Sequence, residues 1–295
     1  MTARFDRLAL LATFVRIAER GSLSAAARDL DTSQPSVSRQ LAALEDLLGR
    51  RLATRTTHSL ALTPDGTALL ADARRMLGAW DGLTERMGEA GALGGTLRVV
   101  APVALGQRHL MDVAAPFARE HPGVAIDWRL TDRPIRFAEE GCDVWIKVGP
   151  VPDDTLVVRE VARVERLVVA TPDLTERHAG QALPAWPWLA LGPFEGSRIM
   201  LHTNDGAETA FTIRPRLATD NIFALLEAVR GNLGAAILPR WFVADDLASG
   251  TLVDAAPDLR AVRLSINLAM VAGTRRPARV ERFVDAVAEW ASRAL

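Results

Sequence analysis

Short hydroxyl and amide side chains, together with one arginine, gather in a single stretch near the N-terminus of the sequence. They alternate with apolar residues whose helical spacing predicts that they face a core, namely Val37, Leu41, Leu44 and Leu48. Hydroxyl, amide and guanidinium groups on the opposite side of such a helix suit the edges of DNA bases and the phosphate backbone. The candidate DNA-contacting residues around this helix are Ser33, Gln34, Pro35, Ser36, Ser38, Arg39 and Gln40.

A second, shorter helix is expected just before this one. Gly21 suits the end of an earlier helix, and Ser22, also a candidate DNA contact, suits the cap of an alanine-rich helix over 23–30. Thr32 or Ser33 is suited to capping the following helix, and Pro35 falls in its first turn, where a missing N–H is tolerated. Two short helices joined by a polar turn are typical of helix-turn-helix DNA-binding proteins. The same pattern also occurs in globular proteins that do not bind DNA, so it leaves both readings open.

An arginine-rich pair of strands is expected after the second of these helices. Gly49 ends the helical pattern, and the short apolar run over 60–62 follows a polar segment. Arginines in this position lie close to the candidate DNA-contacting helix, where they would neutralise phosphates. The candidate DNA contacts of this predicted wing are Arg50, Arg51, Arg55 and Thr56.

A long helix is predicted from Pro64 onward, because Thr63 can cap it and Asp65 favours its N-terminus. Its apolar residues recur at alternating steps of four and three: Leu69, Ala73, Met76, Trp80, Leu83 and Met87. Such a seam is typical of two helices packed together, and we expect a dimer contact here. The alternative is that the helix lies on the core of its own domain. Gly91, Gly94 and Gly95 are expected to end it and form a flexible joint.

Strands and helices alternate through the rest of the chain. Strands are expected at 97–101, 124–130, 144–148, 166–170, 188–191, 199–202, 235–238 and 264–271, and helices at 108–120, 134–140, 221–230, 241–247 and 278–294. This alternation predicts two α/β lobes of similar size, each with parallel strands covered by helices on both faces.

Ligands of such sheets bind beyond the carboxyl ends of the strands. This rule selects a set of candidate ligand-contacting residues: Ala101, Pro102, Val103, Thr131, Asp132, Lys147, Gly192, Pro193, Asn221, Leu238 and Pro239. Lys147 and the helix start at Asn221 would favour an anion. For Lys147, a solvated position at the end of a strand is an equally good interpretation.

Five motifs in this sequence resemble the LysR-type transcriptional regulators: SLSAAARDL (22–30), SQPSVSRQLAALEDLLG (33–49), LTPDG (62–66), EGCDVWIKVG (140–149) and GAAILP (234–239). The resemblance implies an α/β protein with an N-terminal all-α winged helix-turn-helix domain (5–63) and a linker and dimerisation helix (64–90). A two-lobed effector-binding domain of the periplasmic-binding-protein type would follow (96–295). Lobe I would span about 96–162 and 268–295, and lobe II about 163–267. The chain would cross between them near 162–165 and 265–268.

The resemblance also implies partners. Double-stranded DNA would be bound at an interrupted inverted repeat by a homodimer or, as a dimer of dimers, a homotetramer. A small-molecule effector would enter the interlobe cleft, and RNA polymerase is a further possible partner. Two departures stand out: Ala53 replaces the usual phenylalanine of the wing, and Pro102 and Val103 stand where a hydroxyl often occurs. The second departure argues against a carboxylate effector held by such a hydroxyl.

Composition narrows the remaining possibilities. With a net charge of −1, only local patches could bind DNA, and one cysteine in 295 residues suits a reducing compartment. No leader or bilayer-spanning run is evident, so we expect a soluble, cytoplasmic protein without membrane contact.

The five histidines lack metal-ligand spacing and no phosphate loop or nucleophile elbow occurs, so no metal, cofactor or enzymatic activity is expected. A periplasmic-type binding protein would explain the lobes but not residues 21–62, and an enzyme ranks third. Cys142 lacks a resolving partner, which favours buried packing over redox sensing.

Overall fold

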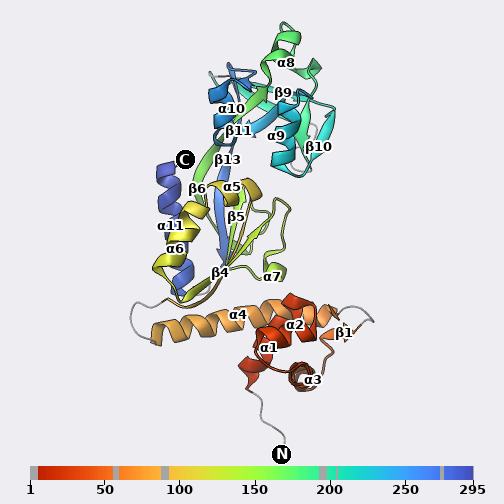
Figure 1. The fold of residues 1–295 in the computed structure, drawn as a ribbon, viewed down its shortest axis with the longest axis vertical. Coiled ribbons are helices and arrows are strands. Elements are labelled where there is room, and N and C mark those ends of the chain that lie inside the picture. The colour runs from red at the N-terminus through yellow and green to blue at the C-terminus, as the bar shows by residue number, and fades with distance from the viewer. Residues whose placement is uncertain are drawn as a thin grey trace, which may run out of the picture.

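The N-terminal part of the protein is a winged helix followed by one long helix. The computed structural model describes residues 6–55, 60–87, 93–192, 198–203, 205–272 and 276–294. The first elements are α1 (Arg7–Arg20), α2 (Leu23–Asp29), α3 (Gln34–Leu48), β1 (Ala53–Arg55), β2 (Leu60–Leu62) and α4 (Pro64–Met87). Figure 1 shows α4 lying across the molecule, between the winged helix and the remainder of the chain.

Local capping sets the ends of the short helices. Gly21 adopts a left-handed conformation (φ 59°) and its N–H donates to the Ile17 carbonyl, which closes α1. The Ser22 hydroxyl accepts from the Ala25 N–H, and the Ser33 hydroxyl accepts from the Ser36 N–H, so each caps the helix that follows it. These contacts confirm the predicted turn between α2 and α3.

The core of the winged helix contains most of the residues predicted for it. Val37, Leu41 and Leu44 are buried together with Phe14 and Ile17 of α1. Leu48 was expected in this core but is 44% exposed. It is the last residue of α3, and the chain turns away at Gly49 (φ 64°), so no later segment covers it.

The second part of the chain is built around one large mixed sheet. The strands of this sheet are β3 (Gly95–Ala101), β4 (Val124–Leu130), β5 (Val144–Val148), β6 (Leu156–Ala170), β8 (Arg198–Thr203), β9 (Glu208–Thr212), β11 (Ala236–Pro239), β12 (Val253–Asp254) and β13 (Leu259–Val271). A separate two-stranded sheet is formed by β7 (Leu189–Leu191) and β10 (Leu217–Thr219). The helices of this part of the chain are α5 (Val103–Arg108), α6 (Met111–Glu120), α7 (Phe137–Glu140), α8 (Pro172–Arg177), α9 (Ile222–Arg230), α10 (Ala244–Ser249) and α11 (Ala278–Ala294), with 3-10 turns η1 (Leu183–Ala185) and η2 (Arg240–Val243).

The strand order shows where the predicted parallel pairing holds and where it fails. β3 is parallel to β4 and β5, as expected. β7 is also parallel to its partner β10, but β10 was not predicted as a strand. β13 instead runs antiparallel to β5 and β6, and β11 runs antiparallel to β6. Figure 1 shows the reason: β6 and β13 are long strands that run in opposite directions through both lobes.

The helices also differ in part from the expectation. The helix expected over 108–120 is α6, which begins only at Met111 after a turn at 109–110, and α5, which precedes that turn, was not predicted. The helix expected over 134–140 begins only at Phe137, and the one expected over 241–247 is the 3-10 turn η2 followed by α10. The bounds of β4, β5 and α11 agree with those predicted.

Each lobe has its own core. In lobe I, α6 and α11 lie side by side (Figure 1), and Phe117 and Phe283 pack edge to face between them with ring centroids 5.3 Å apart. In lobe II, alternate residues of β6 serve two cores. Leu167 packs under α9 on one face of the sheet, and Val168 packs beside Trp188 on the other. None of the helices in the described part of the chain combines the length and hydrophobicity that crossing a membrane requires.

Candidate DNA interface and effector cleft

The exposed face of α3 carries the residues predicted to contact DNA. Gln34, Pro35 and Arg39 are exposed, whereas Ser36 and Ser38 are half-buried. Among the described residues, no hydrogen bond or ion pair engages the Arg39 guanidinium. Figure 1 shows α3 on the side of the winged helix that faces away from the regulatory lobes. The helix is therefore open to a large partner such as duplex DNA.

Three predicted contacts on this surface have other duties. The hydroxyls of Ser22 and Ser33 accept capping hydrogen bonds, so each has its O–H donor left for another group. Gln40 was expected on the outward face, but its Oε1 accepts from the Thr13 hydroxyl at 2.6 Å. Because Thr13 is buried in α1, this hydrogen bond ties Gln40 to the core of the domain and leaves the amide NH2 group of Gln40 for another partner.

Glu45 holds the wing against α3, a role that the sequence analysis missed. Its carboxylate is buried and accepts from the N–H groups of Leu52 (2.8 Å) and Ala53 (3.3 Å). It also contacts Arg51 at 3.2 Å, and Arg51 remains 85% exposed at its side chain. Glu45 directly follows Leu44 on the buried side of α3. An acid at such a position is a signal for nearby hydrogen-bond donors, because a buried carboxylate needs them.

The other basic residues of the wing are placed only in part. Arg50 lies 3.7 Å from Asp65 at the start of α4 and is largely exposed. Arg55 belongs to β1, but its side chain lies outside the described residues, as do Thr56 and the rest of 56–59. Arg50 and Arg51 thus lie at the base of the wing, next to the end of α3.

The seam predicted on α4 divides between two environments. Ala73 is fully buried in the winged-helix core, and Leu69 packs against it, so these two positions follow the alternative in which the helix lies on its own domain. The remaining positions are exposed: Met76 54%, Trp80 48%, Leu83 40% and Met87 82%. These four large apolar side chains form an apolar stripe on one helix, and none of the residues that the structure describes covers it. Gly91 of the predicted joint lies outside the described residues.

Ion pairs attach the winged helix and α4 to lobe I. Glu19 of α1 lies 3.5 Å from Arg74 of α4 and 3.8 Å from Arg98 of β3. Burial lowers the pKa of Arg74, and the charge of Glu19 opposes that shift. Gly141 allows the approach: it has a φ of 59°, and a Cβ there would lie 2.3 Å from the Arg74 side chain. This cluster of Glu19, Arg74 and Arg98 was not predicted, because its members are far apart along the chain.

The candidate effector cleft lies at the carboxyl ends of the lobe I strands. Asp132 accepts from the Val103 N–H at 3.1 Å, and the Thr131 hydroxyl accepts from the Arg133 N–H at 3.1 Å. Burial raises the pKa of Asp132 and lowers the pKa of Lys147, and the two charges partly offset these shifts in each other. Lys147 Nζ also lies 5.5 Å from the Trp145 ring centroid. Asp132 and Lys147 therefore form a half-buried, oppositely charged pair of groups at the strand ends.

Several predicted effector contacts point into the protein instead. The side chains of Ala101 and Leu238 are fully buried in the cores of lobes I and II, because both are interior strand positions. Asn221 caps α9, and its Oδ1 accepts from the N–H groups of Phe223 and Ala224 at 2.9 and 3.1 Å. The expected free N–H groups at this helix start are thus partly occupied.

Other predicted residues stay at or near the cleft. Pro102 and Pro239 are half-buried next to elements of lobes I and II, and the Gly192 N–H donates to the Thr219 carbonyl at 2.8 Å. Pro193 lies outside the described residues. Thr131 lines a cavity of about 350 Å³ whose other lining residues all belong to lobe I: Val100, Arg129, Leu130, Arg133, Pro134, Ile135 and Glu140.

Contacts between the lobes close the cleft in this structure. Arg133 of lobe I pairs with Asp220 of lobe II at 3.2 Å. Arg108 donates to the Phe242 carbonyl at 3.3 Å and lies 5.0 Å from the centroid of that ring. The sequence analysis missed all four residues, because only the folded chain brings them together.

Cys142 packs in a small apolar cluster on lobe I. It is 6% exposed, next to Phe137 and Trp145. Burial raises the pKa of its thiol to about 12. The thiol therefore stays protonated near neutral pH, which makes it a weak nucleophile.

Comparisons with known proteins agree with this architecture over its whole length. Residues 8–67 match the bacterial regulatory helix-turn-helix protein family of lysR type, and residues 90–292 match the LysR substrate binding domain. The chain belongs to the LysR family. It is a DNA-binding transcriptional regulator with an effector-binding domain.

Curated relatives support the same assignment, and solved structures share the fold. The regulator PtxR of Pseudomonas aeruginosa is 30% identical over 294 residues, covering 95% of this chain and 91% of PtxR. The probable regulator LtrA of Klebsiella pneumoniae is 27% identical, with 95% of this chain and 93% of LtrA covered. The fold of this LysR-type regulator is similar to that of ArgP from Mycobacterium tuberculosis (TM-score 0.68, 20% identity, 96% of each chain). It is also similar to LysG from Corynebacterium glutamicum with its effector Arg bound (TM-score 0.64, 22% identity, 98% and 99% covered).

Proposed function

We propose that this LysR-type regulator reads its operator with the exposed face of α3. Gln34 lies at the helix start, where its amide can meet a base edge, and Arg39 lies one turn later, where its guanidinium can meet phosphate or guanine. Arg50 and Arg51 extend the basic surface toward the wing. The observation that carries this proposal is the exposure of Arg39 on a helix whose other face is fixed to α1 by Gln40. This exposed basic helix face supports a role in the regulation of transcription rather than in catalysis.

The exposed stripe on α4 supports pairing with a second copy of this chain. We propose that Met76, Trp80, Leu83 and Met87 cover the same residues of a partner, helix against helix. Such a contact would bury apolar surface that a monomer leaves in water. A symmetric dimer presents two copies of α3 and therefore favours an operator with two related half-sites. Assembly into a homotetramer and contact with RNA polymerase stay predictions.

We propose that a small molecule binds between the lobes and changes their arrangement. Thr131 and Asp132 would contact it from lobe I, and the residues around Asn221 from lobe II. Arg133 and Asp220 would form the gate, because entry between the lobes competes with their ion pair. A ligand that contacts both lobes favours one arrangement by its differential affinity. The lobes connect to α4 through the Arg74 cluster, which gives the change a route to the DNA-binding helices.

A gel-shift titration tests the DNA-binding proposal. The full-length protein would be titrated on the intergenic DNA upstream of its own gene and on an unrelated fragment of the same length. We expect tighter binding to the intergenic DNA and a steep loss of affinity with added salt. Equal, weak binding to both fragments at all salt concentrations would contradict it. Repeating the titration with candidate metabolites would then identify the effector.

A further inference from the structure

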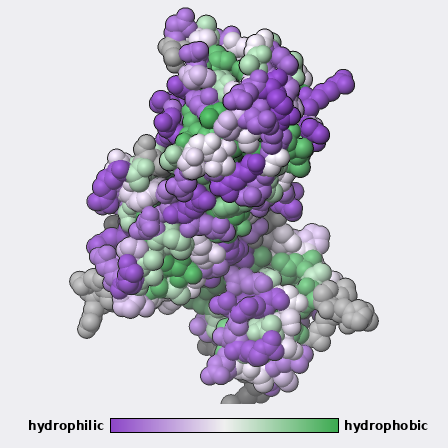
Figure 2. Space-filling model, turned by 45° about the horizontal axis from the view of Figure 1, so that its top comes forward, coloured by the Kyte–Doolittle hydropathy of each residue, from purple (hydrophilic) through white to green (hydrophobic). Residues whose placement is uncertain are grey.

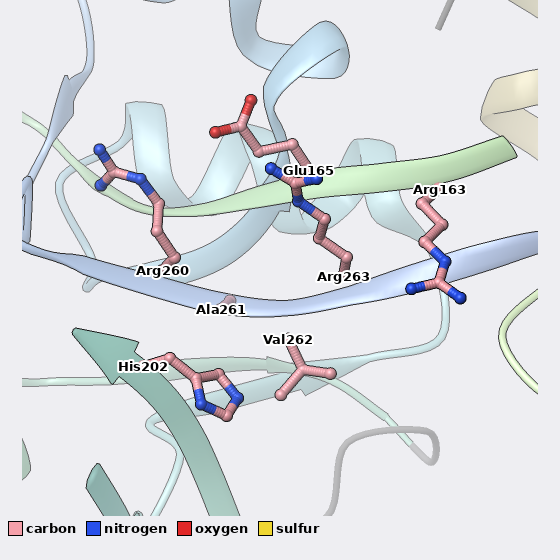
Figure 3. A pocket seen from close by; sticks show the side chains of 7 residues that line it. All are labelled: Arg163, Glu165, His202, Arg260, Ala261, Val262 and Arg263. Atoms are coloured by element: carbon pink, nitrogen blue, oxygen red, sulfur yellow. The ribbon is translucent and has the colours of Figure 1, made fainter. Parts of the chain in front are cut away.

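A second cavity, of about 450 Å³, opens where β6, β13 and β8 lie side by side in lobe II (Figure 3). None of the residues predicted for the effector cleft lines it. Its lining residues come from all three strands and are mainly basic: Arg163, Glu165, His202, Arg260, Ala261, Val262 and Arg263. The face of the molecule in Figure 2 is mostly hydrophilic with scattered apolar patches.

A β-bulge creates this cavity. Ala261 pairs with Arg166, and Leu264 pairs with Val164, so two residues of β13 face a single residue of β6. The bulge is held in place by Arg166, whose Nε and Nη2 donate to the Val262 carbonyl at 2.9 and 2.7 Å. β8 pairs with β13 only as far as Ala261, where the bulge begins. The shape of the cavity therefore depends on the backbone of β13 as well as on side-chain conformations.

The charges around the cavity favour an anion. Three guanidinium groups and the His202 imidazole face one carboxylate, Glu165, which lies 3.9 Å from Arg240. Arg163 pairs with Glu160 at 2.7 Å, Arg260 pairs with Asp254 at 3.5 Å, and the His202 ring lies 3.9 Å from Glu208, but none of these acids lines the cavity. Among the residues that the structure describes, none forms a hydrogen bond or ion pair with Arg263.

The arrangement of these groups suits phosphate in particular. Guanidinium groups bind phosphate oxygens with two parallel hydrogen bonds, and several of them can surround one phosphate. In Figure 3, Arg163 extends from β6 toward β13, and Arg260 and Arg263 extend from β13 itself. Ala261 and Val262 add an apolar contribution to the lining, and the volume is in the range of small-molecule sites.

We propose that this cavity is a second ligand site of the regulatory domain, which binds a small phosphate-bearing molecule. The site is independent of the interlobe cleft. Because Arg163 lies on β6 and Arg263 on β13, the bound phosphate joins the two strands that run through both lobes. Its binding therefore stabilises the regulatory domain as a whole.

Isothermal titration calorimetry of the full-length protein with inorganic pyrophosphate at low ionic strength tests the site. The cavity variant is Arg163→Ala/Arg263→Ala, and both side chains are exposed. The matched control is Arg282→Ala/Arg293→Ala, which removes two exposed arginines from α11. We expect the cavity variant to lose at least tenfold in pyrophosphate affinity and the control to stay within twofold of the unmodified protein. Pyrophosphate should also raise the melting temperature of the control but not that of the cavity variant.

Two results would overturn the proposal. The first is an absence of pyrophosphate binding to the unmodified protein. The second is equal affinity in the cavity variant and the control, which would place the anion elsewhere, for example on the basic surface near α3. Circular dichroism checks folding. If the double variant is unfolded, the single variant Arg263→Ala is compared with the control instead. We expect it to lose at least threefold in pyrophosphate affinity, and an unchanged affinity would contradict the site.

Discussion

Arg279, at the start of the last helix, contacts Asp81 of α4, 198 residues earlier in the sequence, with 3.3 Å between Nη2 and Oδ2. The guanidinium is almost fully buried and also donates to the carbonyls of Thr96 at 3.0 Å and Gly94 at 3.3 Å. One side chain thus joins the linker helix, the joint that follows it and the C-terminal helix. Together with the contacts of Glu19, it attaches the DNA-binding part of the chain to lobe I.

Replacing Arg279 by alanine should destabilise the protein by about 2–4 kcal/mol, because two half-buried carbonyls lose their donor and Asp81 loses its charged partner. Chemical denaturation measures the free energy of unfolding. Arg293→Ala is the control: Arg293 pairs with Glu289 on the surface at 3.2 Å, and its loss should cost less than about 0.5 kcal/mol. Similar effects of the two substitutions would show that the Arg279 contacts contribute little.

The thiol of Cys142 should resist modification in the folded protein. Burial raises its pKa to about 12, so a thiol-specific reagent at pH 8 should react at least 100 times more slowly with the native than with the denatured protein. The sign of the pH effect follows from the same shift. The unfolded thiol ionises first, so the free energy of unfolding falls as the pH rises above about 9. Rapid native labelling would contradict the burial of this residue.

The exposed stripe of α4 should control assembly. A charge at Trp80 would be buried without a partner in the proposed contact between copies, so Trp80→Glu should oppose dimerisation. Sedimentation velocity compares it with Ala68→Glu, at an exposed position of α4 that lies eight residues before the first residue of the stripe. Binding to a half-site should weaken far less than binding to a full inverted repeat. A Trp80→Glu protein that remains dimeric would refute this contact.

The cleft should govern the response to effector without affecting DNA reading. Thr131→Val removes a hydroxyl from the cleft, and Asn221→Ser removes an amide while a serine can still cap α9. The double variant should lose the effector response but keep its effector-free operator affinity within about threefold, a change of less than ~1 kcal/mol. Effector binding is measured by calorimetry with a metabolite that alters the gel shift of the unmodified protein. The effector-free operator affinity is measured by gel shift. Normal effector binding would place the pocket elsewhere.

Local chemistry made much of this fold predictable, whereas its long-range contacts were not. Ser22, Ser33 and Pro35 act within one helical turn, so the sequence alone indicated where α2 and α3 begin. The apolar runs of β4 and β5 and the amphipathic α11 were likewise found within single segments. Glu45 was missed because its partners lie beyond the end of its helix.

The antiparallel course of β6 and β13 depends on tertiary structure, as does the gate between Arg133 and Asp220. The first ten residues of β6 were also missed, because this segment shows no apolar alternation; Val157 and Val158, for example, are adjacent and both more than 40% exposed. Leu48 shows the opposite error, a residue predicted in the core that is exposed. Its helical spacing matches that of the core residues, but it is the last residue of α3 and lies beyond the core. The exposed half of the α4 seam shows that spacing identifies an apolar face but not what covers it.

The most direct test of the account compares Gln34→Ala and Arg39→Ala by fluorescence anisotropy, on the operator and its single-base variants, over a range of salt concentrations. Gln34→Ala should change the preference among operator variants by ~1–3 kcal/mol, as expected for the loss of a base contact. Arg39→Ala should weaken binding to all sequences similarly and reduce the salt slope by about one unit. Equal losses on every sequence with both variants, with the same salt slope, would contradict the separate roles of Gln34 in base reading and Arg39 in phosphate contact, and unchanged affinity in both variants would show that α3 does not read DNA.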